Sequence, residues 1–237
     1  MKIVVNHLTR MQQGYFCVAG LDVNTGEHVR PVLPGQRLPT SLLARYGGPF
    51  DMGVIVDLGA VKATPQKPEV EDHVFDLAKL NAAGTDEPAK FWRRLQQVAR
   101  TRLRDIFGDA LIPRGASSCA VDVGKGDASL GCLVPHQPPS LYVRSRPGRS
   151  DQIRMHVSDG DFHLDLGVTD IRLYDADHVT PDTKVVRRVV KRLQGGLETI
   201  LSVGLTRAYA SSPDFNPVHW LQVNNAHPKD DPLWQLG

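Results

Sequence analysis

The sequence predicts a mainly β protein with two or more helices. Gly accounts for 21 and Pro for 17 of the 237 residues, whereas aromatic residues make up only 6%. Such a composition favours many short strands and turns over a bundle of helices. Strand-like runs recur along most of the chain, and helical periodicity occurs in two stretches. A chain of this length can form one large domain or two small ones, each with its own core.

The first 80 residues contain several strand-like runs. We expect strands at residues 3–5, 15–23, 27–32, 52–62 and 69–75, with the last two paired. The turn sequence Asn24-Thr25-Gly26 separates the second run from the third, so these two predict a β-hairpin. The polar residues 6–13 predict a loop. Four or five strands in this length suit a small barrel or half of a sandwich.

Residues 88–107 show the first helical pattern. Their apolar residues fall within one arc of a helical wheel, and the cations lie on the opposite side. Those cations are Lys90, Arg93, Arg94, Arg100 and Arg104. No acidic residue occurs between Glu87 and Asp105. The face is therefore interpreted either as a solvated helix surface or as a surface for phosphate groups.

Residues 181–197 show the second and cleaner helical pattern. Its apolar side contains Val185, Val186, Val189, Val190, Leu193 and Leu197, and its cations are Lys184, Arg187, Arg188, Lys191 and Arg192. Pro181 and Asp182 at the start, with two glycines from Gly195, agree with the usual preferences of helix ends. We expect the apolar side to pack on a sheet and the basic side to be free.

The second half of the chain predicts a further series of strands. We expect them at residues 129–135, 141–146, 152–157, 162–166 and 168–174. Alternation places Arg144 and Arg146 on one face of their strand, and Arg154 and His156 on one face of the next. Arg149 falls in the loop between these two strands. These residues form a second basic cluster.

The stretch from residue 199 to residue 225 holds the most suggestive polar groups. Two β-rich runs flank a loop at residues 211–214, and Trp220 and Gln222 share one face of the second run. Arg207 lies where the first run ends. An indole beside an amide and a guanidinium can hold a flat heterocycle or a nucleotide. The alternative interpretation places Trp220 in the core and makes Asn224-Asn225 a turn.

Net charge, cysteine content and the length of apolar runs argue against several protein classes. The net charge is only +2 and the pI is about 8.5, so nucleic-acid binding would have to depend on where the cations lie. Three cysteines without Cys-x-x-Cys spacing argue against a disulfide framework or a zinc ribbon. No apolar run is long enough for a membrane span, and we expect a cytoplasmic protein.

The sequence displays no catalytic constellation. The nine histidines are spread singly, and neither a His-x-x-x-His pair nor a Gly-x-Ser-x-Gly motif occurs. Asp161, Asp165 and Asp170 form a carboxylate run, but alternation does not bring all three together. We therefore predict no catalytic residue, no metal site and no cofactor.

Short motifs near both ends of the chain resemble a known family. They are Val4-Val5-Asn6, Cys17-Val18-Ala19-Gly20, His28-Val29-Arg30-Pro31, Ser202-Val203-Gly204-Leu205-Thr206-Arg207 and His219-Trp220-Leu221-Gln222-Val223-Asn224. Together they resemble bacterial proteins described as containing a dual OB (oligonucleotide/oligosaccharide-binding) domain. The resemblance implies tandem small OB-like β-barrels joined by an amphipathic helix. We expect an N-terminal barrel over 1–80, a helical connector over 81–116 and a C-terminal barrel over 117–237.

The resemblance also implies nucleic-acid or nucleotide binding, with single-stranded nucleic acid as the leading ligand. The expected ligand-binding residues are Arg30, Arg207, His219, Trp220, Gln222 and Asn224. The expected contacts to a nucleic-acid backbone are Arg93, Arg94, Arg100, Arg144, Arg146, Arg154, Arg187, Arg188 and Lys191. Two alternatives stay open. One is an enzyme that acts on a nucleotide or nucleic acid in a pocket formed by the terminal motifs. The other is a scaffold subunit that binds an acidic protein partner in a larger complex.

Overall fold

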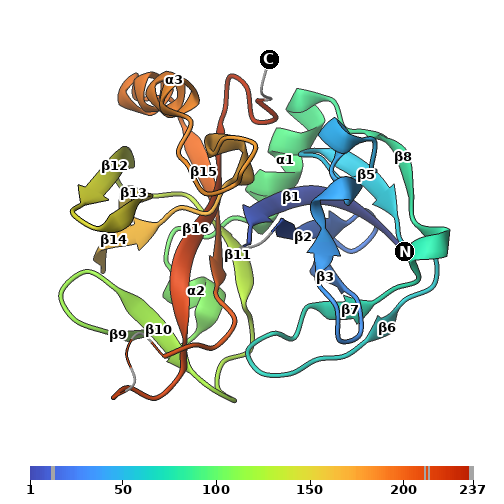
Figure 1. The fold of residues 1–237 in the computed structure, drawn as a ribbon, viewed down its shortest axis with the longest axis horizontal. Helices are drawn as coiled ribbons and strands as arrows, with labels where there is room; N and C mark the ends of the chain where they lie inside the picture. The colour runs from blue at the N-terminus through green and yellow to red at the C-terminus, as the bar shows by residue number, and fades with distance from the viewer. Residues whose placement is uncertain (12–13, 211, 213, 235–237) are drawn as a thin grey trace.

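Three β-sheets and a few helices make up the fold. The computed structural model describes all residues except 12–13, 211, 213 and 235–237. The first sheet contains β1 (Lys2–Arg10), β2 (Tyr15–Asp22), β3 (His28–Val32), β4 (Leu38–Pro39), β5 (Val54–Asp57), β6 (Lys62–Ala63), β7 (Asp72–Val74) and β8 (Asn81–Thr85). Its order is β6-β7-β3-β2-β1-β5-β8, and β4 pairs with β2. In Figure 1 this sheet lies on the right.

Two further sheets come from the second half of the chain. One has the order β11 (Leu130–Leu133), β15 (Thr199–Leu205), β16 (Val218–Pro228), β10 (Cys119–Asp122) and β9 (Ile112–Pro113). The other has the order β12 (Ser140–Arg146), β13 (Arg149–Ser158) and β14 (His163–Gly167). The predicted mainly β class is thus correct. The strand pairing of the described residues leaves all three sheets open, so the two closed barrels of the prediction are not formed by hydrogen bonding.

The helices are short. They are α1 (Pro88–Val98), α2 (Arg104–Phe107) and α3 (Thr183–Gln194), with 3-10 turns η1 (Thr40–Leu42), η2 (Ala44–Tyr46), η3 (Leu77–Lys79) and η4 (Ile171–Leu173). Within the described part of the chain, no helix combines the length and apolarity that a membrane crossing requires.

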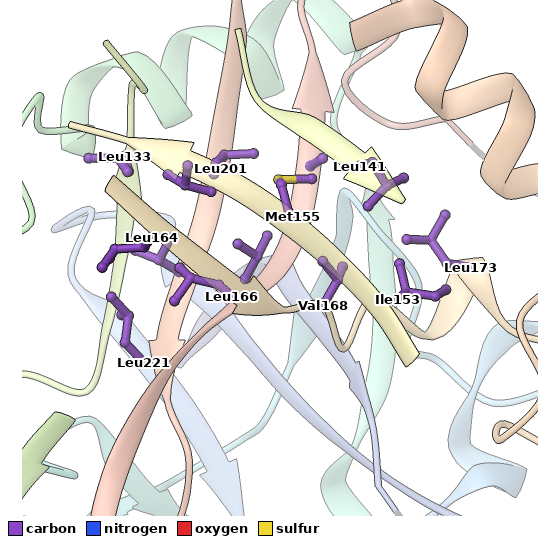
Figure 2. Packing of buried hydrophobic residues seen from close by; sticks show 14 of the residues in the cluster. Leu133, Leu141, Ile153, Met155, Leu164, Leu166, Val168, Leu173, Leu201 and Leu221 are labelled. Atoms are coloured by element: carbon purple, nitrogen blue, oxygen red, sulfur yellow. The ribbon is translucent and has the colours of Figure 1, made fainter. Parts of the chain in front are cut away.

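Buried apolar side chains form two clusters. The first consists mainly of side chains from residues 3–99, and it also takes in Cys132, Ile171 and Ile200. The second consists of side chains from residues 103–234. Figure 2 shows the second cluster, in which side chains of β13 and β14 gather with Leu201 of β15 and Leu221 of β16. The predicted domain limits stay a prediction.

The predicted hairpin is confirmed. β2 and β3 pair antiparallel, with Gly20 opposite Val29 and Leu21 opposite His28. The Asp22 carboxylate accepts hydrogen bonds from the backbone N–H groups of Asn24 and Thr25, at 2.8 and 3.1 Å. This side-chain turn fixes the direction of the loop, as expected for Asp before a tight turn.

The loop predicted at residues 6–13 is wrong over its first half. β1 continues to Arg10 and pairs with β2 along its whole length, so Asn6 to Arg10 belong to a central strand. These polar residues lie in a strand because the neighbouring strands satisfy their backbone groups. The two glutamines that follow lie outside the described residues.

The pairing predicted between residues 52–62 and 69–75 is also largely wrong. β5 pairs with β1 and β8, whereas β7 pairs with β3 in parallel and with β6. Only the end of the run 52–62 meets the run 69–75, where Lys62 pairs with Val74. Alternation shows that a segment is a strand, but it does not show which strand lies beside it.

The predicted helix at residues 88–107 is interrupted. Arg100 leaves the helix and joins β11, where its N–H donates to Cys132 O at 2.9 Å and its carbonyl accepts from Val134 N at 2.8 Å. The chain then changes direction, and α2 begins after Leu103. The N–H group of Leu103 donates to the Asp159 carboxylate at 2.8 Å. Strand pairing in the tertiary structure therefore overrides the helical periodicity.

The second helix is confirmed with shorter limits. The Asp182 side chain caps its start by accepting from the N–H groups of Lys184 and Val185, at 2.9 and 3.1 Å. Val185, Val186, Val189 and Leu193 are buried, as the wheel predicts. Leu197, however, lies beyond the helix and is exposed, because the chain turns at Gly195 and Gly196.

The strand predicted at residues 168–174 is wrong. Val168 forms only an isolated bridge with Val223, and residues 171–173 form the turn η4. The Asp170 carboxylate accepts from the Arg172 N–H at 3.1 Å and pairs with its guanidinium at 2.7–2.9 Å. This local hydrogen bonding competes with a strand conformation.

β1 and β16 meet without regular pairing, and Asn225 joins them. Its Oδ1 accepts from Leu8 N at 2.8 Å, and its Nδ2 donates to Leu8 O at 3.1 Å. The amide thus takes the place of a neighbouring strand for one residue of β1. Nearby, Ser202 Oγ donates to Asn6 O at 2.7 Å. These contacts connect residues that are about 200 positions apart.

We predict that Asn225→Ala destabilises the protein by about 2–4 kcal/mol, because two buried backbone groups of Leu8 lose their partners. Chemical denaturation with an unchanged m-value measures this loss. Asn216→Ala, which changes an exposed Asn in the loop before β16, serves as the control and should stay within about 0.5 kcal/mol of the wild type. A variant Asn225→Ala as stable as that control would contradict the role of the amide.

A buried histidine next to this junction predicts a pH dependence. Burial lowers the pKa of His227 from 6.5 to about 4. Below about pH 6.5 the His227 side chain is therefore protonated in the unfolded chain. In the folded chain it stays neutral down to about pH 4. Stability falls as the pH drops through that window, by about 1.4 kcal/mol per pH unit for this one group.

We expect His227→Gln to lose this part of the pH dependence, while His163→Gln, at an exposed histidine of β14, should keep it. Urea denaturation at pH 7 and pH 5 gives the comparison. Equal pH slopes for the wild type and His227→Gln would show that His227 is not held neutral.

Candidate functional site

Two β-bulges bring polar side chains together between the first sheet and β16. The register of β1 against β2 shifts between Val5 and His7, which leaves Asn6 as the extra residue. The register of β15 against β16 shifts between Ser202 and Val203, which leaves Asn224 as the extra residue. A bulge re-aims the side chains beside it, and bulges are common next to functional sites. The two bulges therefore position the polar groups described next.

Asn224 links the two bulges. Its Nδ2 lies 3.0 Å from Nδ1 of His7, and its Oδ1 accepts from Nε2 of Gln222 at 3.0 Å. Gly204 leaves room for it, because a Cβ at that position would lie 2.5 Å from Nδ2 of Asn224. The predicted ligand-binding residue Asn224 is therefore a buried connection between His7 and the half-buried Gln222.

Three of the predicted ligand-binding residues converge, but around two carboxylates. Arg30 donates to Asp72 at 2.5 Å, and Arg207 donates to the other oxygen of the same carboxylate at 2.8 Å. Arg207 and His219 also lie 3.3 and 3.4 Å from Glu69. The charges of the two arginines are thus matched by two acids, which leaves little positive potential for a phosphate. One nitrogen of Arg30, Nη2, has no partner among the described residues.

Trp220 and Gln222 line a separate pocket of about 270 Å³. Its other residues are Ser118, Arg154, Asp165, Leu166, Gly167, Thr206, Tyr209 and Leu221. The Trp220 ring is half-buried and lies 6.4 Å from the exposed Tyr209 ring, at 45°. In the described part of the chain, the indole N–H of Trp220 has no hydrogen-bond partner. The pocket therefore has an accessible aromatic surface, whereas the indole N–H itself is buried.

Polar groups from the three-stranded sheet close the other side of this pocket. Arg154 of β13 donates to the carboxylate and the carbonyl of Asp165. Arg144 of β12 lies 3.5 Å from the same carboxylate. Burial opposes ionisation of Asp165, but hydrogen bonds from Arg154 and Tyr142 outweigh it and lower its pKa below 3.8. Asp165 therefore presents a charged acceptor held by two arginines.

Alternation makes one face of this sheet polar. Tyr142 lies opposite Arg154, and His156 lies opposite Asp165, so these side chains share a face with Arg144. The rings of Tyr142 and His156 stack at 5.0 Å and 22°. The opposite face carries Leu141, Ile153, Met155, Leu164 and Leu166, which enter the core in Figure 2. Because Val168 bridges to Val223, the polar face continues toward β16 and Trp220.

The predicted cations divide into free and paired groups. Arg93, Arg100, Arg146, Arg187, Arg188 and Lys191 are exposed. Arg94 is not free: it donates to the buried Asp86 carboxylate at 2.6 Å, and Lys90 lies 2.9 Å from the same group. The basic face of α1 thus has an acidic partner immediately before the helix. The helical wheel of residues 88–107 could not show it, because Asp86 lies outside the wheel.

A larger cavity, of about 340 Å³, lies elsewhere in the molecule. It is lined by Leu8, Leu43, Ala44, Arg45, Phe50, Asp51, Ile171 and Arg172. None of the predicted ligand-binding residues lines it. Arg172 is buried and paired with Asp170, so it offers no free charge to a ligand. The smaller Trp220 pocket therefore fits the expected chemistry better.

Sequence reasoning missed two groups of residues. Tyr142 and Tyr209 join the polar surface around Trp220, and the alternation that places Arg144 on one face of its strand also places Tyr142 there. His7, His28 and Cys132 form a cluster whose ligand atoms all lie within 4.8 Å of one another. Spacing could not reveal this cluster, because Cys132 lies 104 positions from His28.

Comparisons with known proteins agree with the terminal motifs. A family model described as a dual OB-containing domain matches residues 1–234. The comparison with curated proteins found no match. The family match extends across the bulges, the ion-pair cluster and the Trp220 pocket alike. Because it covers nearly the whole length, the chain belongs to the family of dual OB-containing domains.

Proposed function

We propose that this protein binds single-stranded nucleic acid, with one base in the Trp220 pocket and the strand across the polar face of β12, β13 and β14. Membership of a dual OB family supports a binding module. The observation that carries the choice of ligand is the half-buried indole of Trp220 beside the Tyr209 ring and the charged side chains of Arg154 and Asp165. The function follows from this site and not from the fold alone.

Stacking is the first interaction that the pocket offers. Trp220 and Tyr209 present two tilted rings to the same space. A nucleobase that stacks on an aromatic ring contributes about 1–3 kcal/mol. The pocket volume of about 270 Å³ fits one base and not a folded duplex. A single strand is therefore favoured, because its bases are free to turn away from one another.

The edge of a stacked base would then meet polar groups. Gln222 supplies an amide, and the Asp165 carboxylate supplies a charged acceptor for the amino groups of bases. Such groups orient a base and add specificity to the stacking energy.

Cations on the adjacent face suit the phosphates. Arg146 of β12 is exposed, whereas Arg144 of the same strand is partly exposed and lies 3.5 Å from Asp165. The stacked rings of Tyr142 and His156 lie on the same face. An aromatic surface with interspersed cations is the usual architecture for binding a single strand. Arg187, Arg188 and Lys191 of α3 extend the set of exposed cations in this half of the chain.

We predict that Trp220→Ala weakens binding of a labelled oligonucleotide by about 10- to 100-fold, because one stacked base is lost. Fluorescence anisotropy at low salt measures the change. Tyr46→Ala, which removes an exposed aromatic ring from η2, is the matched control and should bind as the wild type does. Equal affinities of Trp220→Ala and Tyr46→Ala would exclude this pocket.

We predict that Arg146→Gln lowers affinity for all sequences and reduces the slope of log affinity against log salt by about one. The reason is that an arginine releases counterions when it contacts a phosphate. Lys62→Gln, which removes an exposed cation from β6, should leave the slope unchanged. Wild-type binding that does not depend on salt, or no binding at low salt, would refute the proposal.

A further inference from the structure

We propose that His7, His28 and Cys132 bind a transition-metal ion of the Zn²⁺ type. This site is distinct from the Trp220 pocket and does not depend on the proposed nucleic-acid binding. Three strands supply the ligands: β1 supplies His7, β3 supplies His28 and β11 supplies Cys132. The ion would tie the first sheet to β11, which belongs to the sheet of β15 and β16.

The distances suit a small metal ion. One ligand atom from each residue lies within 4.8 Å of the other two. Cys132 Sγ lies 3.9 Å from Nε2 of His28. In a tetrahedral zinc site the bonds are about 2.0 Å to nitrogen and about 2.3 Å to sulfur, so a nitrogen and a sulfur lie roughly 3.5 Å apart. Because the other pairs lie within 4.8 Å, shifts of up to about 1 Å would bring all three ligands to bonding distance.

The polar groups of the cluster have poor partners. Nε2 of His7 and Oδ1 of Asn6 are buried and have no hydrogen-bond partner in the described chain. The Asn6 amide makes only long contacts, of 3.5 Å to Cys132 Sγ and 3.4 Å to Nε2 of His28. Buried polar groups are nearly always paired, and an exception needs an explanation such as an ion. A metal ion bound by His7, His28 and Cys132 would explain why these buried groups have no protein partner.

The surroundings orient the ligands. Asn224 lies 3.0 Å from Nδ1 of His7, so Nε2 is the nitrogen that remains for the metal. With the amides of Asn224 and Gln222 both turned over, Nδ1 of His7 donates to Asn224, and Asn224 donates to Gln222. Outer partners of ligating histidines usually accept in this way. Arg30 is near His28 in sequence, but Asp72 balances its charge. The bulge at Asn6 is what turns His7 into the cluster.

Two imidazoles and one thiolate favour zinc among the common divalent ions. Sulfur selects against Mg²⁺ and Ca²⁺, which prefer oxygen ligands. Three protein ligands leave a fourth position for water or for Oδ1 of Asn6. His28 is only partly buried and gives the ion a route from solvent.

The test uses the untagged full chain, stripped with a chelator, loaded with Zn²⁺, desalted and analysed by mass spectrometry for metal content. We expect about one ion per chain. Loading with Co²⁺ should give a sulfur-to-cobalt charge-transfer band. Cys132→Ser should lose that band and, like His28→Gln, bind Zn²⁺ at least tenfold more weakly. The matched controls, Cys119→Ser at another buried thiol and His163→Gln at an exposed histidine, should bind as the wild type does.

Wild-type protein that retains less than a tenth of an ion per chain would overturn the proposal. So would a cobalt complex without a sulfur band, or an unchanged zinc affinity in His28→Gln. If Cys132→Ser does not fold, the wild-type cobalt spectrum and the His28→Gln affinity still decide the question. A further expected result is that Zn²⁺ raises the thermal midpoint of the wild type and of Cys119→Ser but not of His28→Gln.

Discussion

The buried contact between β1 and β16 is the constraint on which the rest of the structure depends. Two strands from opposite ends of the chain meet there without a regular ladder, so their backbone groups need other partners. Asn225 supplies both hydrogen bonds to Leu8, and Ser202 supplies one to Asn6. If these amide and hydroxyl groups were absent, the two sheets could not approach without burying unpaired polar atoms.

The same junction positions the candidate sites. A bulge in β1 directs His7 toward His28 and Cys132, and a bulge in β16 directs Asn224 toward His7. Gln222 then connects Asn224 with the pocket that contains Trp220. Polar side chains therefore join the first sheet to β16, and the Trp220 pocket and the cluster of His7, His28 and Cys132 lie at the two ends of one hydrogen-bonded path.

Charge pairing decides which cations remain available to a ligand. Arg30 and Arg207 share Asp72, and Arg94 is held by Asp86. Exposed cations such as Arg146 and Arg187 have more freedom to meet phosphates. Sequence patterns treat all of these residues alike, because a helical wheel or a strand alternation records only the face on which a residue lies. Partners from other elements decide whether its charge is free.

Local sequence patterns are enough to predict the mainly β class, the hairpin around Asn24, the helix that begins after Asp182 and the position of Trp220 and Gln222 on one strand. These features are local, since turn residues, caps and periodicity act over a few positions. Other features arise only when the chain folds: the extension of β1, the break at Arg100, the partners of β5 and β7, and the meeting of His7, His28 and Cys132. Those features depend on contacts between residues up to 217 positions apart, which no local pattern encodes.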